Sequence, residues 1–401
     1  MNRVTANAST QSRATRPGKP VSLAWCSGTR EYTDEMRSIL SWPLGNYGPL
    51  LGYPSLYNPH TADLVHYLGH LLKDGKASLG SYAPEVEEQL AEKLVRRFAN
   101  WMTSENVGVR LFSNGTDSTQ AAVALARFAT GRDLIISIGY HGGSSPVFNF
   151  PPQNGGVLKD NGSAAINVEF GKPIDEAQLY EITEWDEVAA VVVEIPSVED
   201  EEIAQDYLAQ VELDCRTYGA KLIMDEIVTG FRYSSAGALG YYENISADFV
   251  CLGKAMSTYG KVSALLGPAD IMDSLKDRVF ASYTYNDHPF GFYDALQTME
   301  MCDKLPDLYD HINGIGSLLM NGLNTVFSEH GFDAKVYGHP SRTAIRSAYA
   351  SNVFWEFLSR LVDEKNILIH RPQFACYAHS PEDVEKTVVA AGEVLAEMGF
   401  K

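Results

Sequence analysis

The stretch LIMDEIVTGFR at residues 222–232, followed by FVCLGKAMS at residues 249–257, decides the fold. Each piece begins with a short apolar run of the kind that forms buried strands in parallel sheets. Asp225 follows the first run and Lys254 follows the second. Because open α/β folds bind their ligands at the carboxyl ends of parallel strands, both side chains are expected at a ligand-binding edge of the sheet.

An acid and a lysine at this edge suggest a site for pyridoxal phosphate (PLP). The lysine amine can form a Schiff base with the aldehyde of PLP, and the carboxylate can keep the pyridine nitrogen protonated so that the ring accepts electrons. Two simpler interpretations stay open for these residues alone: Asp225 caps the following segment, and Lys254 is an ordinary solvated lysine. Further residues at the same edge decide between the interpretations.

Length and composition limit the class of protein. A chain of 401 residues exceeds what one hydrophobic core usually contains and predicts more than one domain. The net charge of −19 argues against binding along a nucleic-acid backbone, and no apolar run is long enough to insert into a membrane. The five cysteines are scattered without a CxxC pair, which fits a reducing compartment and argues against structural zinc. We expect a cytoplasmic protein without a bound metal.

The domain organisation follows from changes in pattern along the chain. Residues 1–20 have four basic and no acidic residues, which predicts a disordered tail, with an organellar targeting segment as the alternative. Residues 21–80 are aromatic and irregular, suited to the small domain and the active-site entrance. Apolar runs alternate with amphipathic segments over 81–288, which predicts an α/β domain with a mostly parallel sheet covered by helices. Residues 289–401 are predicted to form a smaller α+β domain.

A loop with the sequence SNGTDS lies at residues 113–118, between an apolar run and an Ala-rich helix. The backbone amides at a helix N-terminus form a binding site for a phosphate. Gly115 lets an anion approach the backbone, and Thr116 adds a hydroxyl group. Taken alone, the threonine is also a common helix cap.

The turn Tyr140-His141-Gly-Gly follows the next predicted strand at the same edge. An aromatic side chain there can stack on a flat cofactor, although a tyrosine in a turn is often only packed against its neighbours. His141 is assigned a supporting role, with a hydrogen-bonded turn histidine as the simpler interpretation. A phosphate site, an aromatic side chain, Asp225 and Lys254 in this order favour a PLP site over four unrelated features.

Several segments resemble a known family. SNGTDSTQAAVALARFATGR, IGYHGG, LIMDEIVTGFR, LGKAMS and YTYNDHP are similar, in this order, to the PLP motifs of the class III aminotransferases. The resemblance is greatest to the glutamate-1-semialdehyde 2,1-aminomutase branch. It covers roughly residues 80–290 and returns in RPQFACYAHSPEDVEKTVVAA near the C-terminus. It implies a type I PLP-dependent transferase fold and a homodimer with the cofactor near the subunit interface.

The resemblance assigns roles to the matching residues. Lys254 would be the Schiff-base lysine, and Asp225 would contact the pyridine nitrogen. Ile227 would pack on one face of the ring and Tyr140 on the other.

The phosphate would be bound by Gly115 and Thr116 and, from the neighbouring subunit, by Thr284. Two positions in the phosphate loop differ from the family pattern. Asn114 stands where the family commonly has serine, and Asp117 stands where it has glutamate.

Substrate selection is expected to depend on residues outside these motifs. The glycine-rich run that usually follows the family lysine is replaced by Ser257, Thr258 and Tyr259, which add bulk and hydroxyl groups. Val228 stands where many aminotransferases have a glutamine. The aminomutase branch also lacks this glutamine. Arg371 is a candidate for binding a substrate carboxylate, with a solvated surface arginine as the alternative.

These observations predict a PLP-dependent aminotransferase or aminomutase that acts on a small amino compound through a Schiff base at Lys254. The displaced lysine amine can then move a proton between the substrate and the cofactor. A decarboxylase, lyase or epimerase on the same scaffold is the first alternative, because the segment 257–259 differs from the family. A non-catalytic PLP-binding protein is the second alternative, although neither Lys254 nor Asp225 has been lost.

Overall fold

The computed structural model describes the following residues: 23–33, 35–44, 48–53, 59–73, 84–142, 165–174, 185–258, 261–283, 286, 289–349, 351–369 and 372–401. They form two compact units. The large unit is Ala62–Lys304, and the small unit combines the described residues up to Thr61 with Leu305–Lys401. These limits differ from the predicted domain boundaries at 81 and 288. One reason is that α9, which begins at Pro289, packs against α3 in the large unit.

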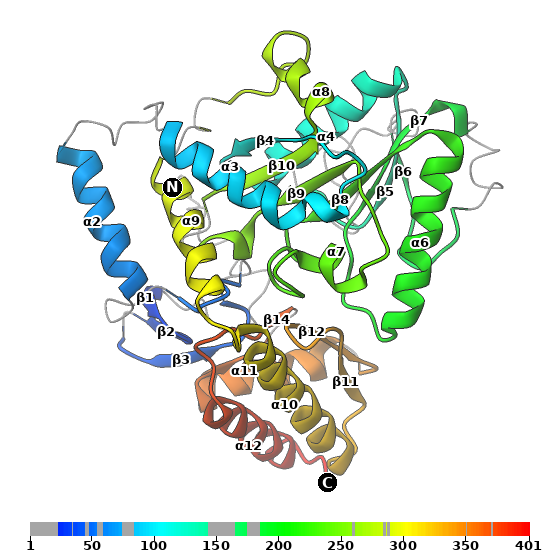
Figure 1. The fold of residues 1–401 in the computed structure, drawn as a ribbon. Coiled ribbons are helices and arrows are strands. Elements are labelled where there is room, and N and C mark those ends of the chain that lie inside the picture. The colour runs from blue at the N-terminus through cyan, green and yellow to red at the C-terminus, as the bar shows by residue number, and fades with distance from the viewer. Residues whose placement is uncertain are drawn as a thin grey trace, which may run out of the picture. The chain divides into compact units, whose positions relative to one another are not determined.

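The large unit is built on a seven-stranded sheet (Figure 1). In spatial order its strands are β4 (Val107–Phe112), β10 (Ser263–Pro268), β9 (Phe249–Leu252), β8 (Lys221–Glu226), β7 (Val188–Val193), β5 (Leu134–Ile138) and β6 (Ala165–Asn167). The strands from β9 to β6 run parallel, whereas β10 is antiparallel to both of its neighbours. The predicted mostly parallel α/β sheet is confirmed.

Helices cover both faces of this sheet (Figure 1). The helices of the large unit are α2 (Pro59–Lys73), α3 (Pro84–Phe98), α4 (Gly115–Thr130), α6 (Glu201–Tyr218), α7 (Gly237–Tyr242), α8 (Ala269–Met272) and α9 (Pro289–Asp303). Successive residues of a strand point to opposite faces. In β8, Ile223 therefore joins the core beneath α4 and α8, whereas Leu222 and Met224 join the core beneath α3, α6 and α9.

The N-terminal part of the large unit differs from the prediction. Residues 21–80 were expected to be irregular, but α2 begins at Pro59 and buries Leu64 and Leu71 on one side. The expectation was wrong there because the aromatic and turn-forming residues before Pro59 obscure the helical period. Helices α4 and α6 each stop at a glycine in the left-handed conformation, Gly131 or Gly219.

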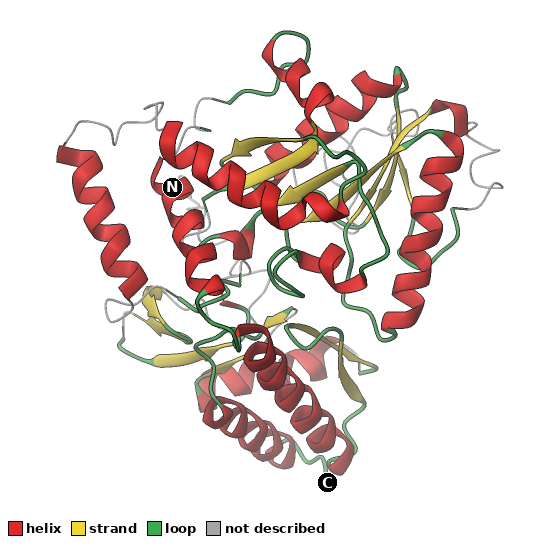
Figure 2. Cartoon of the chain, in the orientation of Figure 1, coloured by secondary structure: helices red, strands yellow, loops and turns green. Residues whose placement is uncertain are grey.

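The small unit combines helices with two small sheets (Figure 2). Its strands are β1 (Leu23–Ser27), β2 (Arg30–Thr33), β3 (Ser38–Ser41) and β13 (Ile367–Leu368) in one sheet, and β11 (Ala334–Tyr337), β12 (Arg342–Ser347) and β14 (Gln373–Phe374) in the other. Its helices are α10 (Leu308–Glu329), α11 (Ser351–Lys365) and α12 (Pro381–Glu397). Ser380 and Asp383 form a reciprocal cap at the start of α12.

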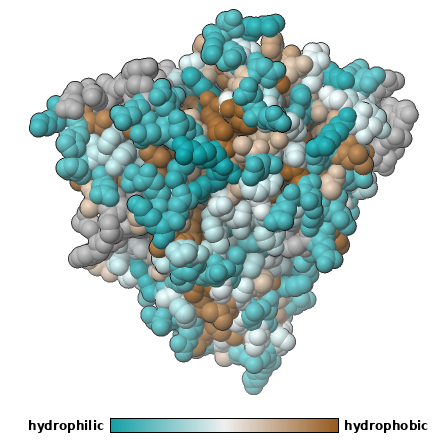
Figure 3. Space-filling model, in the orientation of Figure 1, coloured by the Kyte–Doolittle hydropathy of each residue, from teal (hydrophilic) through white to brown (hydrophobic). Residues whose placement is uncertain are grey.

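Helix α3 of the large unit buries one side. In α3, Leu90, Leu94 and Phe98 are fully buried, and the outward side of this helix is hydrophilic in Figure 3. Among the helices that the structure describes, none combines the length and the apolar character needed to cross a membrane.

Candidate active site

A pocket of about 230 Å³ lies at the carboxyl ends of the parallel strands. Its lining comes from strand ends and from the turns that follow them: Asn114, Gly115, Thr116, Thr119, Tyr140, His141, Gly142, Glu194, Asp225, Ile227, Val228, Lys254 and Val262. Seven of the predicted site residues are among them: Gly115, Thr116, Tyr140, His141, Asp225, Ile227 and Lys254. The structure therefore brings together residues from four separate segments of the sequence.

Asp225 is buried near the end of β8 and is held on both carboxylate oxygens. Its Oδ2 lies 2.8 Å from Nδ1 of His141, and its Oδ1 accepts a hydrogen bond from the backbone N–H of Ile227 at 3.1 Å. His141 is also buried, and its Nε2 has no hydrogen-bond partner among the described residues. His141 is thus a hydrogen-bonded turn histidine, and its partner is the carboxylate predicted to contact the cofactor.

Lys254 lies two residues beyond the end of β9, at the start of a single 3₁₀ turn, Lys254–Met256. Its φ angle of 43° is in the left-handed region, which residues other than glycine rarely adopt. Such conformations persist where the surrounding structure fixes them and are concentrated at functional sites. The turn places Lys254 on the lining of the pocket.

The N-terminus of α4 forms one end of the pocket. Asn114 Oδ1 accepts a hydrogen bond from the backbone N–H of Asp117 at 3.1 Å, and Asn114 Nδ2 donates to Asp117 Oδ2 at 2.6 Å. The two departures from the family pattern therefore form one reciprocal cap, as serine and glutamate do in a capping box. Gly115 has no room for a side chain, because a Cβ there would come within 2.8 Å of Ile227 Cδ1.

Glu194 was not predicted. It directly follows β7, and its Oε2 accepts a hydrogen bond from the backbone N–H of Tyr140 at 2.9 Å. The ring of Tyr140 is 41% exposed, so this turn is held by Glu194 and not by burial of the tyrosine. A signal was available in the sequence: Glu194 follows a buried apolar run directly, as Asp225 does.

Glu226 is fully buried behind Asp225. It accepts hydrogen bonds from the Thr229 hydroxyl, from the backbone N–H of Ala238 at 3.0 Å and from that of Leu239 at 2.8 Å. Burial raises the pKa of the Glu226 carboxyl to about 7, although these hydrogen bonds act in the opposite direction. The side chain ties the loop that follows β8 to the start of α7.

Two predicted substrate residues are not on the pocket lining. Ser257 and Thr258 are buried, and the Thr258 hydroxyl oxygen lies 3.0 Å from that of Thr298 in α9. Three further predicted residues lie outside the described part of the chain: Tyr259, Thr284 and Arg371.

Comparisons with known proteins agree with this geometry. The family model "Aminotransferase class-III" matches residues 28–364. The glutamate-1-semialdehyde 2,1-aminomutase of Alkaliphilus oremlandii (strain OhILAs) is 30% identical over 411 residues, covering 96% of this chain and 93% of the relative. The FumI protein of Sphingopyxis sp. MTA144 superimposes with a TM-score of 0.82 at 21% identity, covering 98% of this chain and 92% of that one. An omega-transaminase from Sphaerobacter thermophilus has a TM-score of 0.77 at 22% identity, with coverages of 94% and 91%.

Proposed function

Because this chain belongs to the class-III aminotransferase family, we propose that it moves the amino group of a small amino compound, with PLP held in the pocket at Lys254. The chain has the type I fold of PLP-dependent transferases, and PLP is the cofactor of the family. The observation that carries the proposal is that Lys254, Asp225 and the N-terminus of α4 meet in one pocket.

The residues of this pocket fit the chemical groups of PLP. A phosphate needs amide and hydroxyl donors, and the N-terminus of α4 offers them at Gly115 and Thr116. A protonated pyridine nitrogen needs a buried acid, which Asp225 supplies. A flat ring is held between two side chains, and Ile227 and Tyr140 are available for its two faces.

When bound, PLP supplies an aldehyde that links to amines and a ring that withdraws electrons from the substrate carbon. Lys254 Nζ would hold the cofactor covalently in the resting enzyme. Once an amino substrate has taken its place, the free amine of Lys254 would lie where it can move a proton between the substrate carbon and the cofactor, as transfer of the amino group requires. The Asp225 carboxylate would stabilise the proton on the ring nitrogen.

His141 and Glu194 act as positioning residues. With Asp225 ionised, His141 donates from Nδ1 to Asp225 Oδ2, which orients the carboxylate. Glu194 accepts the N–H of Tyr140 and thereby fixes the turn that carries the aromatic ring. Neither residue needs to touch the substrate for these roles.

Covalent trapping tests the proposal. The protein is saturated with PLP and reduced with borohydride, and peptide masses locate the modified residue. We expect the label at Lys254, no label in Lys254→Ala, and normal labelling in Lys261→Ala, which removes an exposed lysine nearby. A label retained in Lys254→Ala would contradict the assignment.

A screen of amino donors and acceptors then tests the reaction. Transfer of the amino group to an acceptor, or its movement within one molecule, supports the proposed class. If carbon dioxide release is the only turnover detected, the enzyme is a decarboxylase instead.

We also propose that the protein is a homodimer. Phe280 is 90% exposed and Tyr283 is 38% exposed. They lie four residues and one residue before Thr284, which the family resemblance assigns to the cofactor of the neighbouring subunit. Large exposed apolar side chains on a protein surface are typical of interaction sites.

Light scattering after size-exclusion chromatography is expected to give twice the chain mass of 44.1 kDa. Phe280→Asp should shift the population toward the single chain. A single-chain mass for the PLP-loaded wild-type protein would refute the dimer.

A further inference from the structure

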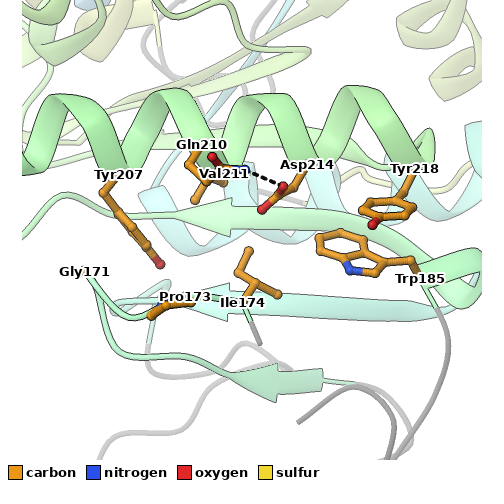
Figure 4. A pocket seen from close by; sticks show the side chains of 9 residues that line it. All are labelled: Gly171, Pro173, Ile174, Trp185, Tyr207, Gln210, Val211, Asp214 and Tyr218. Carbon is orange, nitrogen blue, oxygen red and sulfur yellow. Dashed lines mark hydrogen bonds between the residues drawn. The ribbon is translucent and has the colours of Figure 1, made fainter. Parts of the chain in front are cut away.

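A second pocket lies on the large unit, between α6 and the edge of the seven-stranded sheet (Figure 4). It has a volume of about 340 Å³ and shares no lining residue with the pocket at Lys254. Its lining is Gly171, Pro173, Ile174, Trp185, Tyr207, Gln210, Val211, Asp214 and Tyr218. The proposed amino-group chemistry uses none of these residues.

One side of α6 supplies the upper wall of this pocket. Tyr207, Gln210, Asp214 and Tyr218 are spaced three or four residues apart and therefore share a face of the helix. Gln210 Nε2 donates a hydrogen bond to Asp214 Oδ1 at 2.8 Å. This bond orients the carboxylate, which points from the helix into the pocket in Figure 4.

Aromatic rings stand on both sides of this carboxylate. The rings of Trp185 and Tyr218 are stacked, with their centroids 4.7 Å apart and an angle of 11° between their planes. Tyr207 lies at the other end of the pocket, where its ring meets the ring of Phe170 at 4.8 Å. In Figure 4 the Tyr207 hydroxyl points toward Pro173 and Ile174.

Among the described residues that line this pocket, none carries a positive charge to pair with Asp214, and none forms a hydrogen bond with the Tyr207 hydroxyl. Among the described residues of the lining, Asp214 is the only charged side chain, and burial raises the pKa of its carboxyl. The Tyr207 hydroxyl is shielded from solvent and has no hydrogen-bond partner among the described residues. Burial, and next the negative charge of Asp214, raise the pKa of Tyr207 to about 12.

We propose that this pocket binds a small organic cation that carries an ammonium group. The Asp214 carboxylate attracts the positive charge, and the open face of the stacked pair Trp185 and Tyr218 stabilises it by cation–π interaction. A neutral ligand would leave Asp214 without a counter-charge, and a metal ion would find a single carboxylate among the described lining residues.

Choline is a suitable probe, because its quaternary nitrogen has no hydrogen and cannot form an imine with PLP. Its matched control is the neutral isostere, in which a carbon atom replaces the nitrogen. Isothermal titration of the PLP-loaded enzyme is expected to show choline binding about tenfold more tightly than the isostere. Equal affinities for the two compounds, or no measurable choline binding, would overturn the proposal.

Two variants of α6 locate the binding. Asp214→Asn keeps the shape of the side chain but removes its charge, and should weaken choline binding about tenfold while leaving the isostere unchanged. Asp206→Asn removes the same charge from an exposed position outside the lining and should leave choline binding unchanged. Both variants should keep amino-group transfer at the wild-type rate. Unchanged choline affinity in Asp214→Asn would place the binding elsewhere and refute the assignment.

Discussion

Glu226→Gln should change the pH dependence of stability, because the wild-type side chain titrates differently in the folded and unfolded chains. In the folded protein, burial raises the pKa of Glu226 from its ordinary 4.5 to about 7. A rise of about 2.5 in pKa corresponds to about 3 kcal/mol of free energy. Glutamine has nearly the same shape but cannot ionise, so this contribution is absent from the variant.

The sign of the effect follows from proton binding. Between pH 4.5 and about pH 7 the folded chain keeps the Glu226 proton, whereas the unfolded chain has released it. The wild-type unfolding free energy therefore falls as the pH rises through this range, by up to about 3 kcal/mol relative to the variant. At low pH, Glu226→Gln is less stable than the wild type by about 1–3 kcal/mol. The reason is that the NH₂ group of the glutamine, itself a donor, faces one of the three donors that bond to Glu226 in the wild type.

The assay is urea unfolding of both proteins at about pH 5 and about pH 8, at equal cofactor saturation. The contributions of other titrating groups cancel in the difference between the unfolding free energies of the two proteins at each pH. We expect the stability of the variant to rise relative to the wild type by about 2–3 kcal/mol between these conditions. Glu243→Gln, an exposed glutamate at the end of α7, serves as the control and should show no such change. A difference between Glu226→Gln and the wild type that does not depend on pH would refute the reasoning.

Further predictions concern the pocket at Lys254. Asp225→Asn should still bind PLP but lose turnover by about a hundredfold or more, because a neutral amide cannot hold the ring proton; near-normal kcat would contradict this role. His141→Leu should lower kcat about tenfold and shift its pH profile, whereas His141→Asn, which keeps a donor toward Asp225, should recover most of the rate. Gly115→Ala should weaken PLP binding about tenfold in an absorbance titration, because the new Cβ would come within 2.8 Å of Ile227 Cδ1 and displace the side chain proposed to contact the ring; unchanged affinity would argue against that contact.

The buried part of the fold was largely predictable from the sequence. The strands Leu134–Ile138 and Phe249–Leu252 coincide with short apolar runs of the sequence, because such runs between polar turns have few alternatives in an α/β protein. The direction of β10 was not predictable, since an apolar run indicates burial but not orientation. The helix that begins at Pro59 was missed because propensity near a proline-rich loop is a weak guide to where a helix starts.

The candidate site was predictable where residues follow strands directly. Asp225 and Tyr140 reach one pocket because the carboxyl ends of parallel strands share an edge. Ser257 and Thr258 were expected to contribute to substrate selection, but neither lines the pocket, since a hydroxyl group can also bond within the core, as Thr258 does with Thr298. Sequence position alone does not reveal the direction in which such side chains point.

The left-handed backbone at Lys254 has a consequence for directed evolution. A lysine with a φ angle of 43° is about 1–2 kcal/mol less favourable than a glycine in the same conformation. Lys254→Gly should therefore unfold at a higher temperature than the wild-type chain when both lack PLP, although it has lost the proposed catalytic amine. Selection for heat resistance alone would enrich inactive sequences at this position, so a screen for improved enzymes should measure turnover in the same step.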